Sequence, residues 1–208
     1  VYYGFVAKDK DLENMEDKVL TEKESLDLIS QMIRNTRSRL EDNSGIPFLI
    51  WGYTTVIVAV IVWSLVTTSG NYLWHWLWFA IPVFGGTLWL LHNKKQLNNR
   101  SRVITFVDRA ISHVWMVFGI ASFMISIISF LTYIPILFIV LLTMGMATAI
   151  TGLIIRFKPI IFSGFIGILF SPLCVIVRDA SSILIFAAVF VLMMVIPGHM
   201  LNYKAKRR

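Results

Sequence analysis

Six uninterrupted apolar runs constrain this chain more than any other feature of its sequence. Each has 18 to 22 residues, and they occupy positions 47–66, 72–91, 113–132, 135–155, 160–177 and 180–201. An α-helix rises about 1.5 Å per residue, so such runs can cross a hydrocarbon core of about 30 Å. Only 15% of the 208 residues are charged, whereas soluble domains carry about 25%. The sequence therefore predicts an all-α, polytopic membrane protein with six transmembrane helices over residues 47–201.

The connections between the runs are short enough to pair them. Five residues (67–71) join the first two runs, two residues (133–134) join the next two, and the segment RDASS joins the last two. We therefore expect three antiparallel hairpins. Pro82, Pro172 and Pro197 fall inside runs, where the missing backbone donor should kink the helix.

The basic residues mark one side of the membrane. Sixteen of the 19 Lys and Arg lie in segments 15–46, 92–112, 156–158 and 202–208, whereas the alternate connections carry only Arg178. Because Lys and Arg favour cytoplasmic loops, we expect a multi-pass protein with both termini cytoplasmic. The net charge of +7 needs no direct nucleic-acid partner, since anionic membrane lipids suffice for this basic face.

Ionisable side chains are missing from the centres of the runs. All Asp, Glu, Lys and Arg lie outside the runs or at their margins, whereas ion-coupled transporters and voltage sensors need such groups within the membrane. His75 lies at the outer rim, and His92, His113 and His199 lie at cytoplasmic helix ends. No two of these three stand one turn apart, and no run holds a paired carboxylate or a Ser–His set. We predict no catalytic residue, metal site or cofactor.

Small and aromatic residues indicate packing faces and an interfacial belt. Small residues recur three or four apart in the fourth and fifth runs, as expected where transmembrane helices pack closely: Gly145, Ala149 and Gly152, then Ser163, Gly167 and Ser171. Aromatic residues crowd the outer start of the second run and similar depths elsewhere, as in a headgroup-level belt: Tyr72, Trp74, Trp76, Trp78, Trp63 and Tyr133. A ligand cage is the alternative interpretation of these rings. Cys174, the single cysteine, is interpreted as an apolar side chain that faces lipid or the core and has no chemical role.

Residues 20–43 are predicted to form a cytoplasmic amphipathic helix. Thr21 and Glu24 have the spacing of a capping box. Acidic residues fill the first half and basic residues the second, which matches the helix dipole. The segment EDNSGIP should end this helix, with Gly45 in a left-handed cap and Pro47 in the first turn of the next helix. The apolar stripe consists of Leu26, Ile29, Met32, Ile33 and Leu40.

The apolar stripe of this helix must be covered by something. Its acidic first half is unfavourable against anionic lipid, and it has no Trp or Phe anchor. We expect protein contact: the chain's own bundle first, then a soluble cytoplasmic partner or a second copy in a homo-oligomer. Residues 1–19 are interpreted as a leader or disordered segment, and 202–208 as a basic cytoplasmic tail.

Three segments, SLDLISQMIRNTRSRL, PFLIWGYTT and MGMATAITGLIIRFKP, resemble an uncharacterised family of multi-pass, six-span integral membrane proteins of Bacteroides-type bacteria. The resemblance covers about residues 20 to 208. It implies a multi-pass component of the bacterial inner membrane paired with a small winged-helix DNA-binding regulator, and it assigns no functional residue.

The leading functional hypothesis is a non-enzymatic sensor or interaction protein whose cytoplasmic helix contacts a soluble partner, which the resemblance implies is transcription-regulatory. The alternative is a channel or transporter for a small uncharged solute, favoured by the serine and glycine faces and the prolines. The bundle interior separates the two, because a continuous polar cavity favours transport and a packed core favours signalling.

Overall fold

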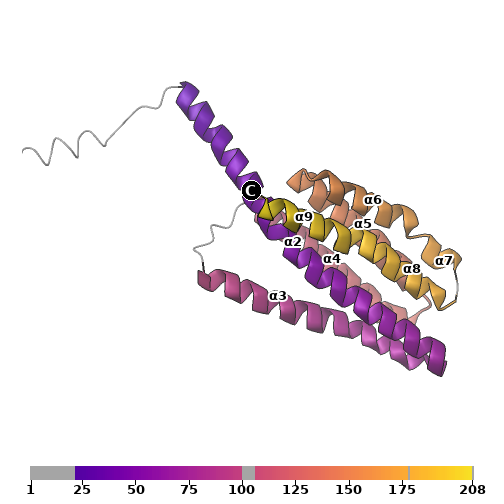
Figure 1. The fold of residues 1–208 in the computed structure, drawn as a ribbon. Coiled ribbons are helices and arrows are strands. Elements are labelled where there is room, and N and C mark those ends of the chain that lie inside the picture. The colour runs from indigo at the N-terminus through magenta and orange to yellow at the C-terminus, as the bar shows by residue number, and fades with distance from the viewer. Residues whose placement is uncertain (1–21, 100–105, 178, 208) are drawn as a thin grey trace, which may run out of the picture. The chain divides into compact units, whose positions relative to one another are not determined.

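The computed structural model describes residues 22–99, 106–177 and 179–207, apart from the side chains at 22–24, 28–29, 32–44, 95–99, 106, 130 and 205–206 (Figure 1). These residues are almost all helical, and no strand occurs among them. The predicted segment 1–19 lies outside the described residues. The helices, including a 3-10 helix (η1) and a π-helix (η2), are α2 (Glu22–Ser69), η1 (Tyr72–Phe79), α3 (Ala80–Asn99), α4 (Phe106–Leu131), α5 (Ile136–Ile155), α6 (Lys158–Phe170), α7 (Leu173–Ile176), α8 (Ser181–Phe190), η2 (Val191–Val195) and α9 (Ile196–Lys206).

The chain divides into two units, Val1–Ser38 and Arg39–Arg208. Within the first unit, residues 22–38 are helical. Within the second, five helical segments of the described chain are long and apolar enough to span a membrane: Gly45–Ser69, Val107–Ser129, Ile136–Ile155, Lys158–Ile176 and Ser181–Lys204. The predicted run 72–91 is not among these five, because it is divided between η1 and α3, and α3 continues into the polar sequence HNKKQLNN.

The closest helix pair is α5 and α6, which lie side by side in Figure 1. The elements α8, η2 and α9 also contact α6. Helix α4 packs against α5. The most closely packed helices therefore come from the fourth and fifth apolar runs, which belong to different hairpins in the predicted arrangement.

The interior of the second unit is filled by side chains from α2, α5, α6 and the last span. Its largest members are fully buried. The aromatic rings of Phe48 (α2) and Trp115 (α4) meet edge to face at 5.8 Å. Burial of such apolar groups excludes water from the contacts between these helices. The fully buried aliphatic side chains are Val62, Leu141, Ile155, Ile160, Met193, Met194 and Leu201.

The predicted helix end at EDNSGIP is wrong. Helix α2 continues from Glu22 to Ser69 with Pro47 inside it. Gly45 does not adopt a left-handed conformation; the described glycine with positive φ is Gly70, at 63°, just after the end of α2. Gly45 serves close approach instead, because a Cβ placed on it would lie 3.1 Å from the carbonyl oxygen of Gly198 in α9.

Pro82, Pro172 and Pro197, the three prolines predicted to kink the runs, lie where the described helices leave regular α geometry, whereas Pro47 lies within α2. Pro172 stands in the turn between α6 and α7. Pro82 is the third residue of α3, directly after η1, and Pro197 follows η2. Proline lacks the N–H that bonds to the carbonyl four residues earlier, so a change of helix type there relieves an unmet hydrogen bond.

The π-helix η2 is held between two glycines from other helices. A Cβ on Gly52 of α2 would lie 3.1 Å from Cβ of Met194, and a Cβ on Gly167 of α6 would collide with Sδ of Met193. A π-turn is wider than an α-turn, so small neighbours on both sides accommodate it.

Candidate functional site

The 3-10 helix η1 arranges its aromatic side chains in columns. The side chain of Asn71 caps it, because Oδ1 accepts a hydrogen bond from the backbone N–H of Leu73 at 2.9 Å. With three residues per turn, positions i and i+3 of a 3-10 helix eclipse one another. Tyr72, His75 and Trp78 therefore share one edge, and the Tyr72 and His75 rings stack with centroids 5.9 Å apart. In an α-helix successive rings at this spacing would be turned by about 60° from one another.

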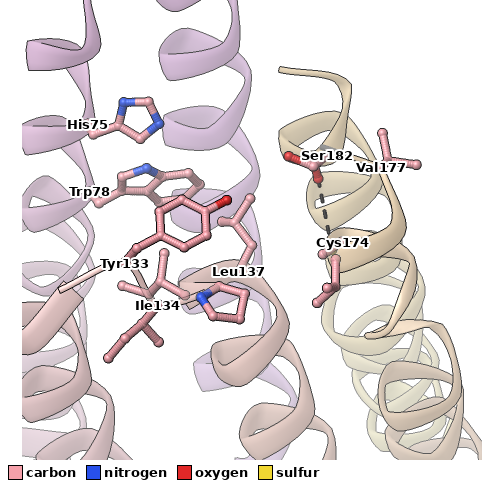
Figure 2. A pocket seen from close by; sticks show the side chains of 11 residues that line it. His75, Trp78, Tyr133, Ile134, Leu137, Cys174, Val177 and Ser182 are labelled. Carbon is pink, nitrogen blue, oxygen red and sulfur yellow. Dashed lines mark hydrogen bonds between the residues drawn. The ribbon is translucent and has the colours of Figure 1, made fainter. Parts of the chain in front are cut away.

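One end of this column lines a pocket of about 360 Å³. Figure 2 shows His75, Trp78 and Tyr133 on one side of it, with Cys174, Val177 and Ser182 on the other. The pocket thus lies between η1, the α4–α5 connection and the α7–α8 region. Its volume is at the lower end of the range of about 300–1,000 Å³ typical of small-molecule sites. The remaining lining residues are Ile134, Pro135, Ile136, Leu137 and Val175.

The pocket wall offers hydrogen-bonding groups but no formal charge among its described lining residues. Nδ1 of His75 donates to the carbonyl oxygen of Tyr72 at 3.0 Å, which leaves Nε2 of the neutral ring as an acceptor. Trp78 contributes an indole N–H, and Tyr133 and Ser182 contribute hydroxyls. Tyr133 is 99% exposed, so its hydroxyl lies at the rim rather than inside.

Two polar groups near the pocket already have structural partners. The thiol of the buried Cys174 donates to the backbone carbonyl of Ser182 at 3.9 Å. The carboxylate of Asp179 accepts from the N–H and the hydroxyl of Ser181, each at 3.2 Å, which satisfies the start of α8. These contacts connect α7 to α8 and hold that wall of the pocket.

The small residues predicted as packing faces of the fourth run lie in the α5–α6 contact. A Cβ on Gly145 would lie 2.8 Å from the backbone N of Ile168, and one on Gly152 would lie 2.6 Å from the backbone N of Ile161. Ala149 faces Gly164, whose added Cβ would lie 2.8 Å from Cβ of Ala149. The two backbones touch at these positions.

The residues predicted for the fifth run are also buried. The hydroxyls of Ser163 and Ser171 donate to the carbonyls of Ile160 and Ile168, at 2.9 and 2.8 Å, within their own helix. Gly167 faces Met193 of η2. These hydroxyls are therefore satisfied locally and do not point to a hydrated path.

The predicted docking stripe lies mostly outside the described side chains. Leu26 is described and is 64% exposed. The side chains of Ile29, Met32, Ile33 and Leu40 are among those not described.

The other three histidines, His92, His113 and His199, do not form a cluster. The imidazole Nε2 of His199 (α9) makes a 2.7 Å hydrogen bond with the hydroxyl of Tyr53 (α2). His113 is exposed on α4, and His92 lies near the end of α3. Across the described ranges, no group of three His, Cys, Asp or Glu side chains could hold a metal ion.

The sequence analysis identified the aromatic residues that line the pocket, but it did not predict that they lie together around one pocket. Trp78 and Tyr133 were interpreted as members of a membrane-interface belt, and His75 as a rim residue. The signal that could have joined them is the three-residue spacing of Tyr72, His75 and Trp78, which align in one column in a 3-10 helix.

Comparison with known proteins adds no assignment: no family model, curated protein or solved structure matches this chain. The resemblance to the Bacteroides-type family stays a prediction, and function must be argued from the residues.

Proposed function

We propose that this chain is an integral protein of the bacterial inner membrane that acts as a non-enzymatic sensor or interaction protein. In this proposal both termini are cytoplasmic, and the helix that precedes the first span contacts a soluble partner, which the family resemblance implies is transcription-regulatory. Five apolar helices long enough to span a membrane support the membrane location, and the uneven distribution of Lys and Arg supports the orientation.

The combined length of η1 and α3 supports a sixth span in this proposal. Eight residues of 3-10 helix rise about 16 Å at about 2.0 Å each. The twelve residues 80–91 of α3 add about 18 Å at about 1.5 Å each. Together they can cross a core of about 30 Å. An even number of spans returns the chain to the side on which it began, which agrees with basic residues near both termini.

The packed interior is the observation that favours sensing over transport. Three of the buried hydroxyls, those of Thr151, Ser163 and Ser171, bond to carbonyls of the same helical segment, whereas Oγ1 of the buried Thr148 has no hydrogen-bond partner among the described residues. Large apolar side chains fill the space between α2, α5, α6 and the last span. A bundle held by such contacts has discrete packing arrangements, which is the property that a signalling element needs.

The stripe of the N-terminal helix provides the test. Leu26, Ile29 and Ile33 would each be replaced by Asp in the full chain, with Gln31→Asp on the opposite side of the helix as the matched control. Affinity purification from native membranes after crosslinking should recover one soluble protein with the wild type and the Gln31 variant, and lose it with the stripe variant. Identical recovered proteins from all three would contradict the proposal.

The second candidate, a channel or transporter for a small uncharged solute, is favoured by the pocket beside η1. Its described lining carries no formal charge, which is compatible with an uncharged solute. Uptake of labelled glycerol and erythritol into proteoliposomes, above that of empty vesicles, would favour transport over sensing.

A further inference from the structure

We propose that the pocket between η1, the α4–α5 connection and the α7–α8 region binds a small, uncharged aromatic molecule that carries a hydrogen-bonding substituent. This inference goes beyond the proposed function, since it assigns a ligand class to a site whose use in sensing or in transport it leaves open. It relies on the proposed orientation only for the side from which the ligand enters, which is the outer side.

The shape of the pocket favours a flat ring. The His75 and Trp78 rings, one 3-10 turn apart, lie on one side of the pocket, and Cys174 and Val177 lie on the other (Figure 2). The Trp78 ring is restrained by the Phe186 ring of α8, which it meets edge to face at 5.5 Å. A restrained ring presents a rigid surface, and a second aromatic ring that packs on it gains binding free energy beyond that of burying its area.

The polar groups favour a hydroxyl, carbonyl or ring N–H on that ligand. Nε2 of His75 is an acceptor, because Nδ1 is engaged by the Tyr72 carbonyl. Neither the indole N–H of Trp78 nor the hydroxyl of Ser182 bonds to another residue in the described part of the chain. A ligand with one donor or acceptor could therefore pair with the wall without displacing a protein hydrogen bond.

The charge of the ligand follows from what the wall lacks. The described lining contains no Lys, Arg, Asp or Glu. Moving an ionised group out of water without a partner is costly. The pocket should therefore discriminate against a carboxylate on the same ring.

Three probes separate these features in the full chain reconstituted in nanodiscs. 2-Naphthol supplies the uncharged ring with a hydroxyl, 1-decanol has the same ten carbons and one hydroxyl without a ring, and 2-naphthoate carries a charge on the same ring. Equilibrium dialysis against empty nanodiscs measures the saturable part of binding. We expect one saturable 2-naphthol site per chain, and binding about tenfold or more weaker for 1-decanol and 2-naphthoate.

Two pocket-filling variants place the binding at this site. Val177→Phe and Val175→Phe add volume to lining positions, and both should abolish saturable 2-naphthol binding. Ile176→Phe is the matched control, because Ile176 lies between them, is 72% exposed and is not a lining residue. It should bind like the wild type. Melting temperatures within a degree or two of the wild type identify the variants that are folded, and Val175, already 41% exposed, is the more tolerant position.

Three results would overturn the inference. They are no saturable 2-naphthol binding to the wild type, equal binding to folded filling variants, and 1-decanol binding as tight as that of 2-naphthol, which would mean that the pocket accepts an acyl chain. None of these depends on recovery of a soluble partner, so failure here is distinguishable from failure of the sensor proposal.

Discussion

Replacement of Gly152 by Ala should destabilise the bundle at the α5–α6 contact. A Cβ at this position would lie 2.6 Å from the backbone N of Ile161, whereas ordinary contact begins at 3.4 Å. The two helices would have to part by about 0.8 Å, the difference between these distances. The obstructing atom belongs to the backbone, so no side-chain rotation can relieve the clash. Overpacking of this kind costs about 1–3 kcal/mol.

The matched control is Gly119→Ala in α4. Gly119 is helical, and a Cβ on it would meet nothing within 4 Å. Ala is the better helix former by up to about 1 kcal/mol, so this variant should be as stable as the wild type or more stable. Thermal unfolding of the full chain in one detergent, followed by circular dichroism, measures both. The Gly152 variant should melt several degrees lower. Equal melting temperatures for the two variants would refute the argument that backbone contact at Gly152 holds α5 to α6.

Three further variants test local features by the same unfolding assay. Asn71→Ala removes the acceptor for the Leu73 N–H and should cost about 1 kcal/mol, whereas Asn71→Asp retains an acceptor and should cost less; equal costs would contradict the cap. Arg156 has φ of 57°, so Arg156→Val should be less stable than Arg156→Gly by about 1–2 kcal/mol, and the reverse order would show that conformation is not limiting there. Tyr53→Phe removes the 2.7 Å hydrogen bond to His199 and should cost about 0.6 kcal/mol, the average for polar contacts between transmembrane helices. A Tyr53→Phe variant that melts like the wild type would argue against a stabilising role for this hydrogen bond.

Run length and apolarity were enough to predict the all-helical class and five of the six expected spanning helices. A stretch of about 20 apolar residues must satisfy its backbone hydrogen bonds within itself, so helix is the remaining choice in a membrane. This reasoning located the five described segments that could span a membrane. It could not divide 72–91 into η1 and α3, because a continuously apolar run has no polar face from which its helical period can be measured.

Which helices pack against each other was harder to predict from the sequence. Short connections show which helices follow one another in the chain, but they say little about which helices are in closest contact. Small residues were the better guide. Gly145, Ala149 and Gly152 were grouped by their spacing, and they lie where α5 meets α6. Gly45 was interpreted conformationally, although its lack of a side chain permits the approach of α9 to α2. A glycine near a proline carries both signals, and the sequence alone could not decide between them.

The π-helix in the last span has a consequence for how this chain can change in evolution. A π-turn holds one residue more than an α-turn, which rotates all that follows by about 100°. Gly198 faces α2 only in this rotated setting, and a Cβ on it would lie 2.9 Å from Cδ2 of Leu49. Deleting one residue between Phe190 and Ile196 would turn this glycine away and bring a bulkier neighbour against α2. A lineage that gains or loses that residue should therefore also show its small residue displaced by one position.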